Sequence, residues 1–179
     1  MIFALHEHPH DVATEDGPRV VYDLGRGTAS LGAARVDGPA LVWELAGSRD
    51  GAAALAVELE LADATDWVVR CDRVDFPPGS VAYRHVHPGP GIRRLLVGAL
   101  TIEAEGYTRT YGAGEAWFEG AGFPVRATSS ETEDTAFVRV LLLPGEWAGK
   151  RTIRYLDPAD EAKPKRQRAE ILLEEPLRL

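Results

Sequence analysis

All five histidines of this 179-residue chain fall in two short alternating clusters, and imidazole is the side chain that metal sites use most often. The first cluster is His6, His8 and His10, and the second is His85 and His87. Residues two positions apart on a strand point to the same face, so such a pair brings two imidazoles into one small volume. The second cluster therefore predicts a divalent-metal site in the middle of the chain.

The segments around these histidines alternate between apolar and polar residues, which is typical of half-buried antiparallel strands. Turn residues such as Pro77-Pro78-Gly79 and Gly112-Ala113-Gly114 separate the segments. Many short strands at this spacing predict an all-β sandwich or barrel. We expect strands over residues 41–45, 55–61, 67–76, 81–87, 92–97, 100–104, 116–119 and 135–143, and a last strand over 169–175.

Composition divides this single domain into three parts. Residues 1–40 are richer in Gly, Pro and Asp and show one clear strand, at 19–24, so we expect an N-terminal extension there. Residues 41–150 form the predicted barrel, and residues 151–179 form a polar linker and a final strand. That strand must pair with its own sheet or with a neighbouring subunit, and the second alternative makes a homodimer an expected state.

Charge and composition restrict the function classes. The net charge of −8 opposes general nucleic-acid binding, which needs a basic face. No apolar run reaches the roughly 20 residues of a membrane span, and the longest candidate, 136–144, is broken by Arg139. The N-terminus shows no secretory signal pattern, and a single cysteine, Cys71, fits a reducing compartment. We expect a cytoplasmic protein without nucleic-acid or membrane partners.

Residues 79–98 resemble the first motif of the cupin superfamily: Gly79, five residues, His85-Val86-His87, and then Gly98. The glycine-rich stretch from Gly106 to Pro124 resembles the second motif of that family. The resemblance covers residues 65–145 and implies a single-domain, RmlC-like jelly-roll barrel of the double-stranded β-helix type.

The resemblance also implies a divalent metal such as iron, manganese, nickel or zinc, although the ligand set is incomplete. His85 and His87 fill the first two ligand positions, but Gly91 stands where the family has a carboxylate and Val125 where it has a third histidine. Glu119 is the expected replacement ligand, with a surface carboxylate at the end of a strand as the alternative.

The N-terminal histidine cluster could complete the metal site if its segment folds over the mouth of the barrel. Its position beside Pro9, close to the chain start, also fits a flexible surface segment. Both alternatives stay open from the sequence.

Three further side chains are candidates for contact with a substrate. Tyr83 shares a strand face with the histidines, and Trp117 is either a pocket wall or core. If Gly91 occupies the inward family position, Arg93 is also inward. A buried guanidinium keeps its charge, so an inward Arg93 needs a carboxylate or phosphate partner, either Glu119 or an anionic substrate. A surface salt bridge or cation–π contact is the alternative.

Several functions remain compatible with these residues. One is a metal-dependent enzyme, of the oxygenase or isomerase type, that uses His85 and His87. Another is a metal-free barrel that binds or senses a ligand without turnover, and a third is a metal-free acid–base enzyme that uses Tyr83 and His85. In each of them we expect a small, anionic molecule inside a cupin-type barrel.

Overall fold

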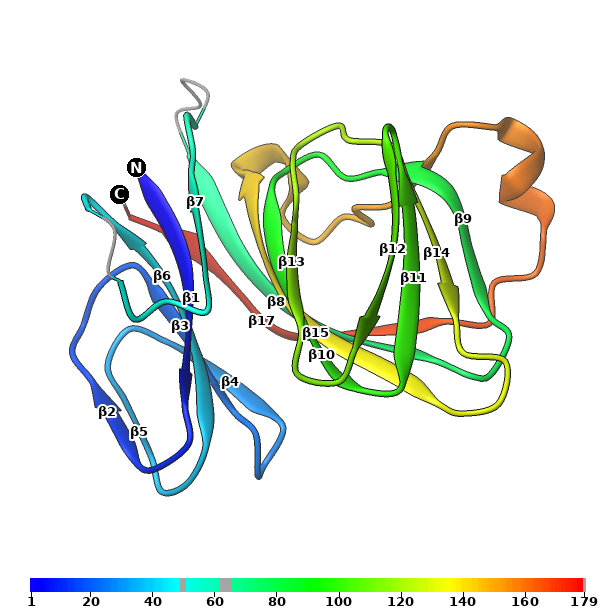
Figure 1. The fold of residues 1–179 in the computed structure, drawn as a ribbon. Coiled ribbons are helices and arrows are strands. Elements are labelled where there is room, and N and C mark those ends of the chain that lie inside the picture. The colour runs from blue at the N-terminus through cyan, green and yellow to red at the C-terminus, as the bar shows by residue number, and fades with distance from the viewer. Residues whose placement is uncertain (49–50, 62–65, 179) are drawn as a thin grey trace.

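Antiparallel strands make up most of the described chain (Figure 1). The computed structural model describes residues 1–48, 51–61 and 66–178. Within these residues the helices are two short 3-10 turns, Gly145–Trp147 and Pro158–Ala162. None of the described helices has the length and apolar character needed to cross a membrane. The predicted all-β class is confirmed.

Two five-stranded sheets form a barrel from residue 67 onward. Their strand orders are β13-β10-β15-β8-β17 and β12-β11-β14-β9-β16, so the chain crosses repeatedly between the sheets. The order over β8 to β15 is that of a jelly roll, which confirms the predicted architecture. The strands are β8 (Trp67–Phe76), β9 (Val81–Val86), β10 (Gly91–Val97), β11 (Ala99–Ala104), β12 (Tyr107–Gly112), β13 (Ala116–Glu119), β14 (Val125–Ser129), β15 (Thr135–Pro144), β16 (Arg154–Tyr155) and β17 (Arg168–Leu177).

A third sheet, built from the N-terminal strands, lies against the outer face of the barrel sheet that contains β8 and β15 (Figure 1). Phe3, Leu5 and Trp43 of this sheet pack in one core with Val69 and Val140 of the barrel. The barrel sheet is therefore buried on both faces. The N-terminal strands are β1 (Ile2–His8), β3 (Arg19–Asp23), β4 (Thr28–Leu31), β6 (Ala40–Ala46) and β7 (Leu55–Glu58), with a ribbon of β2 (Val12–Thr14) and β5 (Ala34–Val36) beside them.

The boundary between extension and barrel differs from the expected residue 41. β6 and β7 fall inside the range 41–150 expected for the barrel, yet both pair with β1 in the N-terminal sheet. Residues 1–40 also hold more strands than the one expected at 19–24. β2, β4 and β5 have only three or four residues each, which is too short for an alternating pattern to be detected.

The C-terminal strand completes the barrel of its own chain. β17 pairs with β8 from Arg168 to Leu177, so it needs no neighbouring subunit as a pairing partner. β16 extends the other sheet beside β9. The segment between β16 and β17, orange in Figure 1, lies at the side of the barrel where these two edge strands run.

Candidate functional site

A cavity of about 560 Å³ lies inside the barrel, within the range of roughly 300–1,000 Å³ that is usual for small-molecule sites. One half of its wall is apolar, and the other half carries charged and imidazole side chains. The apolar half includes Val74, Phe76, Ile102, Trp117, Ala127 and Phe137. The polar half is formed by Arg70, Asp72, His85, His87, Arg93, Glu119 and Arg139.

Alternation along β8 and β15 produces this division. Asp72 and Val74 are two positions apart on β8, and both face the cavity. Arg139 of β15 lies opposite Asp72, and Phe137 lies opposite Val74. The two strands therefore place their charged residues at one level of the barrel and their apolar residues at the next.

The two predicted histidines both face the cavity and are buried, with ring centroids 5.0 Å apart. His85 Nδ1 lies 2.6 Å from the carbonyl oxygen of Tyr83, so Nδ1 carries the proton and Nε2 keeps its lone pair. Burial lowers the pKa of His85, and the Glu119 carboxylate opposes this shift in part.

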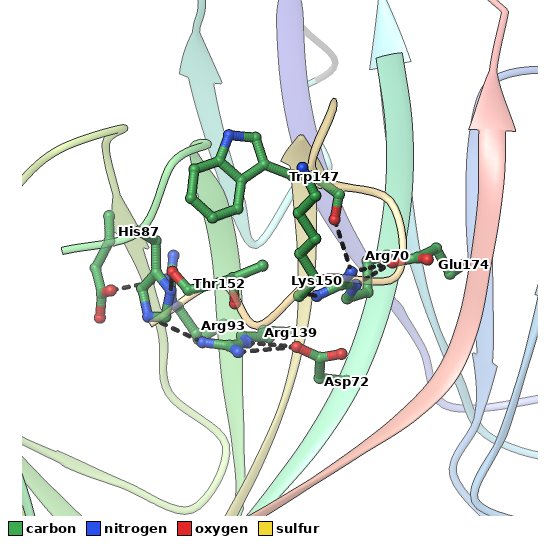
Figure 2. A network of polar contacts seen from close by, with 10 residues as sticks. Arg70, Asp72, His87, Arg93, Arg139, Trp147, Lys150, Thr152 and Glu174 are labelled. Carbon is green, nitrogen blue, oxygen red and sulfur yellow. Dashed lines mark hydrogen bonds and ion pairs between the residues drawn. The ribbon is translucent and has the colours of Figure 1, made fainter. Parts of the chain in front are cut away.

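His87 is held between two partners that determine its tautomer (Figure 2). Arg139 Nη1 lies 3.1 Å from His87 Nε2, and Nε2 must accept because a guanidinium can only donate. Nδ1 then donates to the carbonyl oxygen of Thr152 at 3.1 Å. Burial, followed by the positive charges of Arg139 and Arg93, lowers the pKa of His87 well below its usual range. The ring is therefore neutral, and its lone pair is engaged.

Arg139 connects His87 to a buried carboxylate. Its Nε and Nη2 both donate to Asp72 Oδ2, at 3.0 and 2.8 Å. The side chains of Arg139 and Asp72 are only 9% and 3% exposed, so these charge-assisted bonds lie in a low-dielectric interior. His87, Arg139 and Asp72 thus form a continuous chain of hydrogen bonds between the two barrel sheets.

Arg93 and Glu119 form a second buried pair, and the inward orientation of Arg93 agrees with its prediction. Arg93 Nη2 lies 2.7 Å from Glu119 Oε2, and Arg93 Nη1 donates to the carbonyl oxygen of Gly91 at 2.6 Å. Glu119 Oε1 accepts from Trp117 Nε1 at 2.8 Å. Burial lowers the pKa of Arg93, and the neighbouring Glu119 carboxylate opposes that shift. Both carboxylate oxygens of Glu119 therefore have partners.

The expected metal set of His85, His87 and Glu119 does not fit this arrangement. Arg139 occupies the lone pair of His87, and Glu119 neutralises Arg93. Two guanidinium groups beside the histidines would also repel a divalent cation. In the part of the chain that the structure describes, no three His, Cys, Asp or Glu side chains are grouped so that they could hold a metal ion. The role of Glu119 as a ligand is corrected to that of a counterion.

A bulge in β9 turns Tyr83 away from the cavity, contrary to its prediction as a substrate contact. The register with β14 shifts between Ala82 and His85, and both of these residues line the cavity although they are three positions apart. A bulge inserts one extra residue and so changes which residues face inward. The ring of Tyr83 instead lies 4.8 Å from Lys163 Nζ.

Trp117 fits both of its predicted roles. It lines the cavity, and its ring stacks on Tyr111 with centroids 4.9 Å apart, so it is also part of the core.

The N-terminal histidines lie away from the cavity. His6 and His8 belong to β1, and His6 Nε2 is 3.4 Å from a Glu44 oxygen, so these two residues lie neither in a flexible segment nor at the barrel mouth. His10 lies in an exposed bend after β1.

The remaining charges of the polar half were not predicted from the sequence. Figure 2 shows Arg70 held by Glu174 and by the carbonyl oxygens of Trp147 and Lys150. A charge in a strand that is otherwise apolar is the signal that could have revealed such residues. Arg139 carries this signal, since it breaks the apolar run 136–144.

By sequence, the chain matches no protein-family model and no curated protein. Similar solved structures include the polyketide cyclase RemF from Streptomyces resistomycificus (20% identity over 53% of this chain and 63% of that chain, TM-score 0.41). Others are an RmlC-like cupin from Shewanella frigidimarina (16%, 43% and 67%, TM-score 0.39) and an oxalate oxidase in complex with the substrate analogue glycolate (23%, 54% and 52%, TM-score 0.43). The chain thus spans about half to two thirds of the length of these proteins. Its own strand order is that of a jelly roll.

Proposed function

We propose that this cupin-fold protein binds a small amphipathic anion in its barrel cavity, and that it does so without a metal. The observation that carries the proposal is the excess of cationic side chains around the cavity of a chain whose net charge is −8.

Cationic side chains outnumber carboxylates in the cavity wall. The cations are Arg70, Arg93, Arg139, Lys150, Arg151 and Lys165, and the carboxylates are Asp72, Glu119 and Glu161. Glu174 neutralises Arg70 from outside the wall, which still leaves more positive than negative charges. A concave, low-dielectric site with such an excess concentrates anions.

The apolar half of the cavity favours a ligand with a hydrocarbon or ring system. Phe76, Trp117 and Phe137 contribute aromatic rings to this half. Burial of apolar ligand surface there is worth about 25 cal/mol per Å². A ligand with one apolar end and one anionic end would use both halves of the cavity.

A metal-dependent enzyme, one of the functions compatible with the sequence, is disfavoured by the donor atoms themselves. His87 Nε2 and both Glu119 oxygens already have partners, and these partners include two guanidinium groups. Ligand binding that uses the fixed charges of the chain agrees better with this site.

Fluorescence titration with 8-anilinonaphthalene-1-sulfonate tests the proposal, because the fluorescence intensity of this aromatic sulfonate increases when it binds in an apolar site. Its uncharged counterpart, N-phenyl-1-naphthylamine, has the same ring system and reports the apolar contribution alone. We expect the sulfonate to bind at least about tenfold more tightly, since hydrogen bonds to charged groups are worth about 1.5–3 kcal/mol. Equal affinities of the two probes would contradict an anion site.

A pair of alanine variants localises the probe. Ala127→Phe fills the apolar half of the cavity and should abolish the binding of both probes. Ala113→Phe adds the same ring in an exposed turn and should leave both affinities unchanged. Sulfonate binding that survives Ala127→Phe would place the probe outside the cavity and contradict the proposal.

A further inference from the structure

We propose that Arg139 is the group that holds the anionic end of the ligand, in the place beside His87 where a metal would otherwise coordinate. This inference rests on the proposed function, because it names the receptor for the anion. One juxtaposition carries it: the guanidinium that donates to His87 Nε2 also faces the cavity.

Arg139 is fixed in this place by the chain around it. Nη1 donates to His87 at 3.1 Å, while Nε and Nη2 donate to Asp72 at 3.0 and 2.8 Å (Figure 2). A metal would have to displace a guanidinium that is anchored on two sides. Unlike a metal, the guanidinium is part of the chain and keeps its charge at any physiological pH. The positive charge that a metal ion would supply beside His87 therefore comes from the Arg139 side chain.

Arg139 has donors left for a ligand. A guanidinium carries five N–H bonds, one on Nε and two on each terminal nitrogen. Asp72 takes one from Nε and one from Nη2, and His87 takes one from Nη1. One N–H remains on each terminal nitrogen. Two neighbouring N–H donors suit the oxygens of a carboxylate, sulfonate or phosphate, which arginine binds in a bidentate manner.

The other three arginines that line the cavity are less suited to this role. Arg151 is an exposed residue whose Nη1 and Nη2 both donate to Glu161. All three side-chain nitrogens of Arg70 donate to Glu174 or to the carbonyl oxygens of Trp147 and Lys150. Arg93 is paired with Glu119, and its side chain is 1% exposed. Of the buried guanidinium groups of Arg70, Arg93 and Arg139, that of Arg139 is the most accessible, since its side chain is 9% exposed.

The test compares two charge-neutral double variants in the fluorescence titration. Asp72→Asn with Arg139→Gln removes the proposed receptor and its counterion together, so no buried charge is left alone. Glu103→Gln with Arg126→Gln removes an exposed ion pair, 2.6 Å long, from strands of the same barrel. We expect the first double variant to bind the sulfonate about tenfold more weakly and the neutral probe unchanged. The second should bind both probes like the parent, and a chelator should not affect the parent.

The outcomes separate this inference from the proposed function. If the parent prefers the sulfonate and the Asp72→Asn, Arg139→Gln variant keeps that preference, the anion lies elsewhere and Arg139 is not its receptor. Loss of sulfonate binding by the parent after treatment with a chelator would also overturn the inference. A parent without any preference for the sulfonate would refute the proposed function itself.

A second variant, Arg139→Lys, serves if the double variant fails to fold, because lysine keeps the positive charge but loses the paired donors. That variant should weaken sulfonate binding at least about threefold, and an unchanged affinity would overturn the inference.

Discussion

Replacement of Glu119 by glutamine should strongly destabilise the protein, because it leaves Arg93 buried without a counterion. Arg93 is 1% exposed, and its Nη2 lies 2.7 Å from the Glu119 carboxylate. Two unit charges about 4 Å apart attract by about 4 kcal/mol at an effective dielectric constant of about 20. Loss of one partner of such a buried pair usually costs about 3–5 kcal/mol. We expect a loss of that size in the free energy of unfolding, measured with urea.

The double variant Arg93→Gln, Glu119→Gln separates charge from shape. Both side chains keep hydrogen-bonding groups while the buried charge disappears, so at least about 2 kcal/mol should be regained relative to Glu119→Gln alone. Glu115→Gln is the matched control, since Glu115 pairs with Arg109 at the surface. It should cost about 1 kcal/mol or less.

Two results would refute the reasoning about Glu119. One is a loss below about 1 kcal/mol for Glu119→Gln, which would mean that Arg93 is adequately solvated without its partner. The other is a parent protein that a chelator destabilises as much as the substitution does, because Glu119 would then act through a bound metal.

Other properties of the fold can be tested in the same way. Burial depresses the pKa of both His85 and His87, so the unfolded chain binds more protons and stability should fall as the pH drops below about 6.5. Each histidine contributes up to about 1.4 kcal/mol per pH unit, and urea unfolding of His85→Gln, His87→Gln should show a shallower slope. A Cβ at Gly89 would lie 1.8 Å from a carbonyl oxygen of β15, so Gly89→Ala should cost about 3 kcal/mol or more. Gly47→Ala, which meets no described atom within 4 Å, should stay within about 0.5 kcal/mol in thermal unfolding. Trp43→Ala should cost about 3–5 kcal/mol and preserve a single unfolding transition by circular dichroism, whereas two transitions would contradict a shared core.

Strand alternation predicted most strands of the barrel and part of the N-terminal sheet. It missed β12, β14 and β16 of the barrel, and it missed β1 and β4 of the N-terminal sheet while it predicted β3, β6 and β7. β8 (Trp67–Phe76) and β13 (Ala116–Glu119) match their expected ranges, because turn residues bracket them. β1 was missed because its buried residues come first and its polar residues last, so no alternation appears. A strand gives this pattern when its first residues are buried on both faces and its last residues reach the protein surface. Periodicity alone does not identify such a strand.

The site was predicted in part. An inward Arg93 was expected on condition that Gly91 occupies the inward position, and Glu119 was one of the partners expected for it. The role of Arg139 depends on residues far away in the chain, since Asp72 is 67 positions and His87 is 52 positions distant. Such pairings follow from the register of β8 with β15 and from the bulge in β9, and neither can be obtained from a single sequence.

The N-terminal sheet explains how the barrel can hold so many buried charges. Along β8, Asp72 faces the cavity while its neighbour Cys71 packs outward, and along β15 Arg139 faces the cavity while Val138 and Val140 pack outward. The desolvation of buried ions opposes folding even when they are paired. Apolar packing on the opposite face of the same strands, against Trp43 and its neighbours, supplies stabilisation that offsets this cost. A barrel without this outer layer would expose the apolar face of the strands that carry its charges. The charged cavity therefore depends on the N-terminal sheet.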